Sequence, residues 1–183
     1  MLSLDRDNLV DALKKYGIRF LAGGDESTRE MSPPDLIRAL AEHRDARLHL
    51  ALTSLFLAHP DLSACVPEIV DLLTEKARIE LEARYMAAVY LQRMWKTRLG
   101  YYLGNFRELP DYFSAALRLP SADERFGKAG LDALGEWHAQ QSEFSYNHLA
   151  SYEKALELLI GQLKVESRHW CGKDFASNRS MWM

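Results

Sequence analysis

The longest apolar pattern in the chain lies between residues 74 and 104, which contain no proline and no glycine before Gly100. At about 100° per residue, one face of a helix collects Leu81, Tyr85, Ala88, Trp95 and Leu99. The opposite face carries Met86, Tyr90 and Met94. Apolar residues on most sides indicate burial, so the pattern predicts a buried central helix over residues 75–99, with shorter helices packed around it. Gln92 lies within the first face, and its amide is predicted to find hydrogen-bond partners in the core.

The segments before this helix carry helix-start signals. Ser32 is followed by two prolines and Asp35, a strong start because the hydroxyl can cap free backbone N–H groups and proline suits the first turn. This helix is predicted to reach about residue 43. Asp45 can cap a second helix that stops near Pro60.

The segments after the central helix are predicted to be helical as well. Residues 110–117 indicate a short helix opened by a proline, and a longer one is expected from Pro120 to Gln141. Its glycines predict either close packing of two backbones or an interruption of the helix. Residues 147–166 place apolar side chains at alternating steps of three and four, a heptad seam typical of an intramolecular bundle.

No segment alternates with period two between hairpin turns, so no sheet is expected. The predicted fold is all-α: a helical bundle, or irregular helical array, around the long central helix. Residues 1–168 are predicted to form a single helical domain and residues 169–183 a C-terminal tail.

The helical hairpin near the N-terminus adds a family resemblance. Residues 35–73 resemble one unit of a HEAT-type helical repeat, with Asp45 and Arg47 in the places of that family's Asp-x-Arg start of the second helix. The resemblance implies stacked helices that bind proteins. A solenoid needs several units, and no second copy follows in this chain, so a local hairpin is expected.

Charge and targeting signals predict a soluble, cytoplasmic protein. The formal net charge is only −3, with both signs interspersed, so the whole-chain balance favours neither nucleic acid nor an anionic membrane as partner. The first residues are acidic where a signal peptide would be basic, and the longest apolar run is too short to cross a bilayer. Cys65 and Cys171 lack the spacing of a disulfide framework, which fits a reducing compartment.

One short pattern suggests catalysis. Residues 44–49, Arg-Asp-Ala-Arg-Leu-His, are similar to the Arg-x4-His motif of HEPN ribonucleases. This resemblance implies that His49 acts as acid or base on a ribose 2′-hydroxyl and that Arg44 stabilises the phosphorane. The motif lies late in the domain in that family but precedes the central helix here. The alternative is an arginine at a helix start beside a partly exposed histidine.

A basic and aromatic stretch lies between residues 83 and 107. It holds the five cations Arg84, Arg93, Lys96, Arg98 and Arg107 and six aromatic residues. The composition suggests RNA binding, but on a continuous helix Arg93 and Lys96 fall on a different side from Arg84 and Arg98. We therefore predict that these side chains cover apolar surface with their stems and reach water with their heads.

No metal or cofactor is predicted. Glu166 and His169 have the Glu-x-x-His spacing of a di-iron site, but no second copy exists, and His169 with Cys171 gives only two zinc ligands. His138 and His148 have no partner at ligand spacing. The carboxylates Glu75, Glu80 and Glu82 are interpreted as a solvated helix start.

These observations favour a non-enzymatic helical protein that binds another protein. The candidate binding residues are Arg93, Lys96 and the tail aromatics Trp170, Phe175 and Trp182. In size and class the chain is similar to small bacterial partners of minimal nucleotidyltransferases and to members of toxin–antitoxin pairs. The alternatives are a HEPN-like ribonuclease that uses Arg44 and His49, and an RNA-binding protein. A second copy of the same chain, forming a homodimer, is the second candidate partner.

Overall fold

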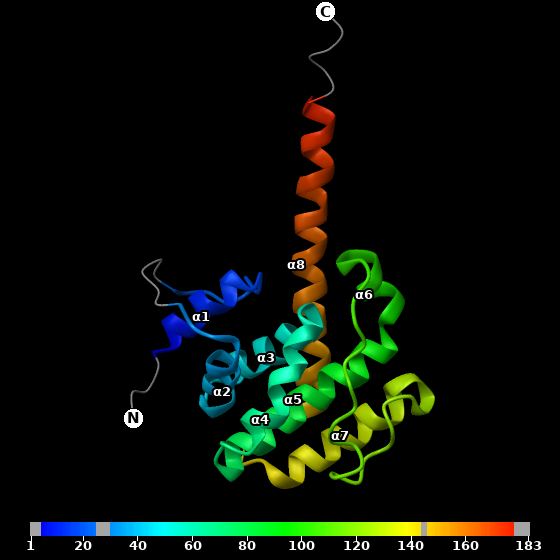
Figure 1. Ribbon diagram of the computed structural model, residues 1–183. Coiled ribbons are helices and arrows are strands. Elements are labelled where there is room, and N and C mark those ends of the chain that lie inside the picture. Colours follow the sequence, from blue (N-terminus) through cyan, green and yellow to red (C-terminus); the bar gives the residue numbers. More distant parts are fainter. Residues whose placement is uncertain (1–4, 25–29, 144–145, 178–183) are drawn as a thin grey trace, which may run out of the picture.

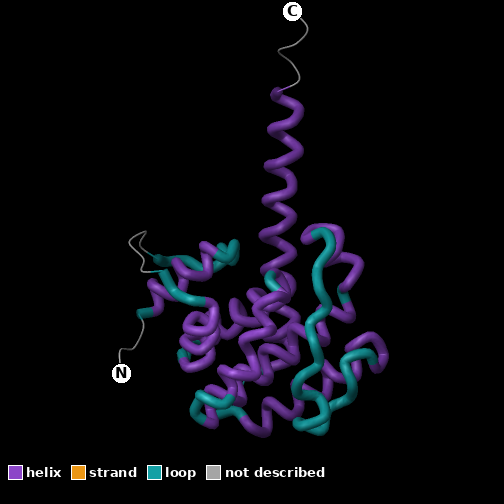
Figure 2. The backbone as a smooth tube through the Cα atoms, in the orientation of Figure 1, coloured by secondary structure: helices purple, strands orange, loops and turns teal. Residues whose placement is uncertain are grey.

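The computed structural model describes residues 5–24, 30–143 and 146–177, and for residues 169–177 it describes the helical backbone only. Helices joined by loops and turns account for these ranges, and none of the described residues lies in a strand (Figure 2). The prediction of an all-α fold is confirmed.

Helices of very different length make up the described chain (Figure 1). In order they are α1 (Arg6–Lys15), α2 (Pro33–Glu42), α3 (Ala46–Ala58), the 3₁₀ turn η1 (Pro60–Cys65), α4 (Val66–Val70), α5 (Glu75–Met94), α6 (Lys96–Leu103), the 3₁₀ turn η2 (Glu124–Gly127), α7 (Lys128–Gln141) and α8 (His148–Ser177).

Helix α5 is the buried centre of the fold, as its pattern predicts. It packs against α3 and α7, and also contacts α2 and α8. Side chains from both of its apolar faces, including Leu81, Tyr85, Met86 and Tyr90, are fully buried. Burial of a large apolar side chain contributes about 1.5–3 kcal/mol, so this helix supplies much of the apolar stabilisation.

The prediction of one continuous helix to residue 99 is wrong at Trp95. The backbone of Trp95 leaves the helical region at φ −116° and ψ 22°, and α6 begins at the next residue. At this break Trp95 is 38% exposed, although the pattern predicted burial. Helix α6 ends at Leu103 and is followed by Gly104, whose φ of 72° is readily adopted by glycine.

The predicted helix starts at Ser32 and Asp45 are confirmed. The Ser32 hydroxyl oxygen accepts a hydrogen bond from the Asp35 backbone N–H, and the Asp45 carboxylate accepts one from the Arg47 N–H at 2.8 Å. The resulting helices α2 and α3 pack against each other. Their likeness to a HEAT-type unit stays a prediction.

The region between α6 and α7 differs from the prediction. Residues 114–118 form turns rather than the expected helix, and α7 starts at Lys128 rather than near Pro120. Both explanations offered for the glycines apply. Gly127 has φ 88° at the interruption, and a Cβ on Gly130 would lie 2.1 Å from Cε1 of Tyr90, so α5 and α7 approach closely there.

Helix α8 continues past its predicted end at Glu166 to Ser177. Its first turns bury Tyr152, Leu156 and Leu159, and its C-terminal half extends away from the body (Figure 1). The backbone is therefore helical across the predicted boundary between domain and tail. The side chains of Trp170 and Phe175, and all of Trp182, lie outside the described residues.

Within the described ranges, no single helix combines the length and apolar composition needed to cross a membrane. Among the described helices, one pair, α3 taken together with residues 60–70, reaches this length and apolar composition, but its two parts are bent by 109°.

Candidate functional site

An open groove lies at the interruption of the helix between α5 and α6. Its volume is about 710 Å³, and residues 93–98 form one wall together with tyrosines of α6 and Phe126 of η2. Three large rings around it reach solvent: Tyr101 is 82% exposed, Phe126 81% and Trp95 38%. The site lies at the break at Trp95, whose side chain the predicted continuous helix would have placed on a buried face.

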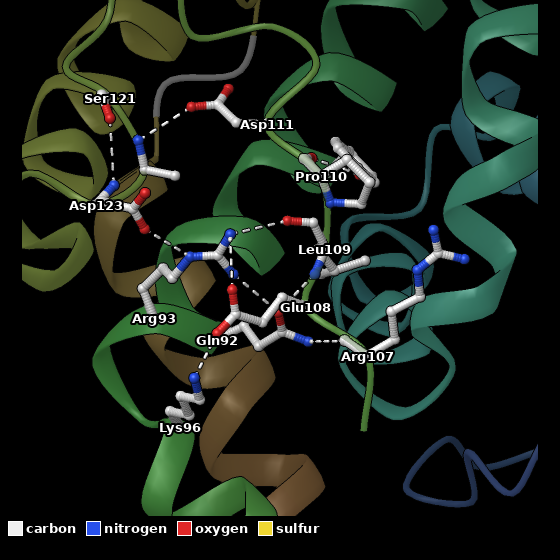
Figure 3. Close-up of polar contacts among 12 residues, drawn as sticks. Gln92, Arg93, Lys96, Arg107, Glu108, Leu109, Pro110, Asp111, Ser121 and Asp123 are labelled. Carbon is white, nitrogen blue, oxygen red and sulfur yellow. Dashed lines mark hydrogen bonds and ion pairs between the residues drawn. The ribbon is translucent and has the colours of Figure 1, made fainter. Parts of the chain in front are cut away.

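Gln92 and Arg93 fix the wall of the groove to the loop that follows α6 (Figure 3). The Gln92 amide donates to the Arg107 carbonyl at 3.1 Å, and its oxygen accepts from the Leu109 N–H at 2.7 Å. Arg93 donates to the Leu109 carbonyl at 3.1 Å. The predicted need of Gln92 for partners in the core is thus confirmed.

The predicted binding residues Arg93 and Lys96 both line the groove, but their charges have partners within the chain. Arg93 lies 3.0 Å from an oxygen of Asp123 and 3.7 Å from one of Glu108, and its side chain is only 14% exposed. Lys96 pairs with Glu108 (Figure 3). The hydrogen bond from Lys96 and the charge of Arg93 lower the pKa of Glu108.

Arg98 differs from these two cations. Its side chain is exposed, and its guanidinium carbon lies 5.5 Å from the ring centroid of Trp95, a cation–π distance. None of the ion pairs in the described part of the chain involves Arg98. It is the lining cation whose charge is most open to a ligand.

Phe126 is held out to solvent by an unusual backbone. Arg125 and Phe126 both have left-handed conformations, with φ of 48° and 56°. Such a conformation costs a residue other than glycine about 1–2 kcal/mol. A large apolar side chain therefore stands exposed at the rim of the groove on a strained turn.

A second polar cluster lies inside the bundle and joins four helices. The Glu80 carboxylate of α5 accepts from His138 Nε2 of α7 at 2.9 Å and from Arg84 Nε at 3.4 Å. The opposite nitrogen of His138 accepts from the Tyr152 hydroxyl of α8 at 2.6 Å. His49 of α3 directs Nδ1 to Glu80 at 3.3 Å.

The α7–α8 connection, through Tyr146, and the first turn of α8, through Ser151, contribute to this cluster too. Arg84 donates to the Tyr146 hydroxyl at 2.7 Å and to the Ser151 hydroxyl at 2.9 Å, and it lies 5.2 Å from the centroid of the Tyr152 ring. The Arg84 side chain is fully buried, so the prediction that its head reaches water is wrong. The interpretation of Glu80 and Glu82 as solvated is also wrong, because both are buried, although Glu75 is exposed. Arg84 and His138 hold Glu80 in the core, and Glu82 pairs with Arg78.

Burial and charge set the protonation of the cluster. Burial alone would raise the pKa of Glu80, but the hydrogen bond from His138 and the charge of Arg84 lower it to about 2. Burial lowers the pKa of His49 to about 4 and also lowers that of His138, against the attraction of Glu80. Near neutral pH the cluster thus contains an ionised carboxylate, an arginine and neutral imidazoles.

The two residues of the ribonuclease hypothesis lie in different environments. Arg44 is exposed before α3, whereas His49 is 1% exposed and its Nε2 lies 2.7 Å from the His43 carbonyl oxygen. His49 is therefore more buried than the partly exposed histidine of the alternative interpretation. In this arrangement an RNA 2′-hydroxyl cannot reach the imidazole.

Among the described residues, no three His, Cys, Asp or Glu side chains gather as a metal-binding group. The side chains of His169 and Cys171, which together would supply only two zinc ligands, lie outside the described residues.

Sequence reasoning missed both the groove and the internal cluster. Glu80 and Arg84 are four residues apart, a signal for an ion pair, but His138 comes 58 residues later with no local sign of contact. The exposed aromatic wall depends on the backbone break at Trp95 and the strained turn at Phe126, which periodicity does not reveal.

In comparisons with known proteins, no family model, curated protein or solved structure matches this chain.

Proposed function

We propose that this chain is a non-enzymatic helical protein that works by binding another protein at the groove between α5, α6 and η2. The observation that supports this most is the set of exposed rings, Trp95, Tyr101 and Phe126, around a cavity of about 710 Å³. Aromatic side chains that cluster around a groove are typical of the centre of a protein–protein interface.

The strain at Phe126 supports the same proposal. A turn that keeps a phenylalanine 81% exposed in a left-handed conformation adds nothing to the apolar core and costs stability. Burial of that ring by a partner would recover apolar stabilisation of about 1.5–3 kcal/mol.

Catalysis by Arg44 and His49 has weaker support. His49 would have to leave the core and give up its contacts with the His43 carbonyl and Glu80. The ribonuclease hypothesis therefore requires a rearrangement of α3, whereas the groove is open as the chain stands.

The proposal can be tested by quantitative affinity purification from the native host cell of the protein. Nucleotidyltransferases and toxin–antitoxin components are included among the candidate partners. The double variant Tyr101→Ser, Phe126→Gly removes two exposed rings, and Leu72→Ser removes an exposed leucine elsewhere as a matched control.

A protein captured by the wild type and by Leu72→Ser, but lost from the double variant, is the expected result. Capture that the double variant retains in full, or no capture above a tag-only control, would overturn the proposal.

A further inference from the structure

We infer that the groove takes a segment of a partner protein that carries a carboxylate beside a bulky apolar anchor residue. This inference rests on the proposed protein-binding function and adds the chemistry of the partner.

The charges around the groove determine which charge the partner must carry. The lining includes Arg93, Lys96 and Arg98 and no carboxylate. Glu108 and Asp123 already pair with the first two, so Arg98 is the lining cation that forms no ion pair with the described residues. A carboxylate of a partner placed against Arg98 would form an ion pair while the guanidinium stays on Trp95.

The rings set the second requirement. Tyr101 and Phe126 come from α6 and η2, which are separated in the chain but line one groove. An apolar side chain that enters between them would bury two rings that now face solvent. Buried aromatic residues of this kind are typical of interface hot spots. The acidic group and the anchor are thus expected close together in the partner's sequence.

The same geometry disfavours a single strand of RNA. Bases could stack on the rings, but consecutive phosphates would meet the flanking carboxylates, since Asp123 is 83% exposed and Glu108 about half exposed. One carboxylate beside one arginine avoids this repulsion.

The test is selection of random twelve-residue peptides displayed on phage against the full chain, followed by affinity measurements on synthetic peptides. The expected sequences contain Asp or Glu within a few positions of Trp, Phe or Leu. Their affinity is expected to fall as salt is raised.

Three variants locate the contact. Arg98→Glu should weaken the affinity for the selected peptides about tenfold or more, because it replaces attraction of their acidic residues by repulsion. Phe126→Gly should weaken them at least about fivefold through loss of the anchor contact. Arg47→Glu, which reverses an exposed arginine of α3 outside the groove, should leave the affinity unchanged.

Selection of peptides without acidic residues, equal loss in Arg98→Glu and Arg47→Glu, or tighter binding of a labelled twelve-nucleotide oligouridine at the same groove would overturn the inference. If affinity purification still captures a protein through the rings in any of these cases, the proposed function stands and only the partner chemistry is wrong. Loss of ring-dependent capture identifies failure of the function itself.

Discussion

Replacement of Glu80 by glutamine should destabilise the fold far more than the same replacement of Glu82. Both carboxylates belong to α5 and both are buried, but their partners differ. Glu80 faces Arg84, whose side chain is fully buried, and accepts from His138 at 2.9 Å. Glu82 pairs at 2.8 Å with Arg78, whose side chain is 51% exposed.

The magnitudes follow from these environments. Loss of one partner from a buried ion pair costs about 3–5 kcal/mol, because the remaining charge stays in the core. Arg84 keeps its hydrogen bonds to Tyr146 and Ser151, so we expect the lower end, about 3 kcal/mol. Arg78 can turn to water, so Glu82→Gln should cost less than about 1 kcal/mol.

The assay is urea unfolding followed by circular dichroism at 222 nm. In a domain of this size, a loss of about 3 kcal/mol should also lower the melting temperature by about 6–12 °C. Glutamate and glutamine have similar helix propensities, so the control removes that contribution. Equal losses in Glu80→Gln and Glu82→Gln, or an unchanged Glu80→Gln variant, would refute the argument that the cluster depends on paired buried charges.

Three further predictions concern stability. Gly130→Ala should cost about 1–3 kcal/mol because its Cβ would meet an aromatic ring, whereas Gly161→Ala, with open space around it, should gain up to about 1 kcal/mol; equal unfolding midpoints would contradict this. Burial lowers the pKa of His49 from 6.5 in the unfolded chain to about 4 in the folded one, so between pH 7 and pH 5 the unfolded chain binds a proton that the folded chain does not. The free energy of unfolding should therefore fall by about 2 kcal/mol over this range, and a urea midpoint that does not change with pH would disprove it. Phe126→Gly should raise the free energy of unfolding by about 1 kcal/mol by relief of a left-handed conformation, and a clear loss on calorimetry would refute the strain.

The predictions that rest on local signals agree with the structure. The hydroxyl of Ser32 and the carboxylate of Asp45 cap helices through contacts within three residues, so the pattern alone determines them. The burial of α5 follows from apolar residues on most sides of one segment. The need of Gln92 for partners also follows from its position on that face.

Contacts between distant residues could not be predicted in this way. The break at Trp95 lies where the loop at residues 107–109 is hydrogen-bonded to the end of α5, and no periodicity in residues 75–99 records that loop. The same holds for His138, which reaches Glu80 from another helix. The candidate site was therefore predicted only through Arg93 and Lys96, while Arg98, Tyr101 and Phe126 emerge from tertiary structure.

The most direct test of the proposed docking groove is site-specific photo-crosslinking in the cell that encodes the chain. A photoreactive phenylalanine analogue replaces Tyr101 in the groove or Leu72 outside it, and both positions are well exposed. The account predicts a discrete protein adduct from position 101 that is absent from position 72. The same adducts from both positions, or an adduct from position 72 alone, would contradict it.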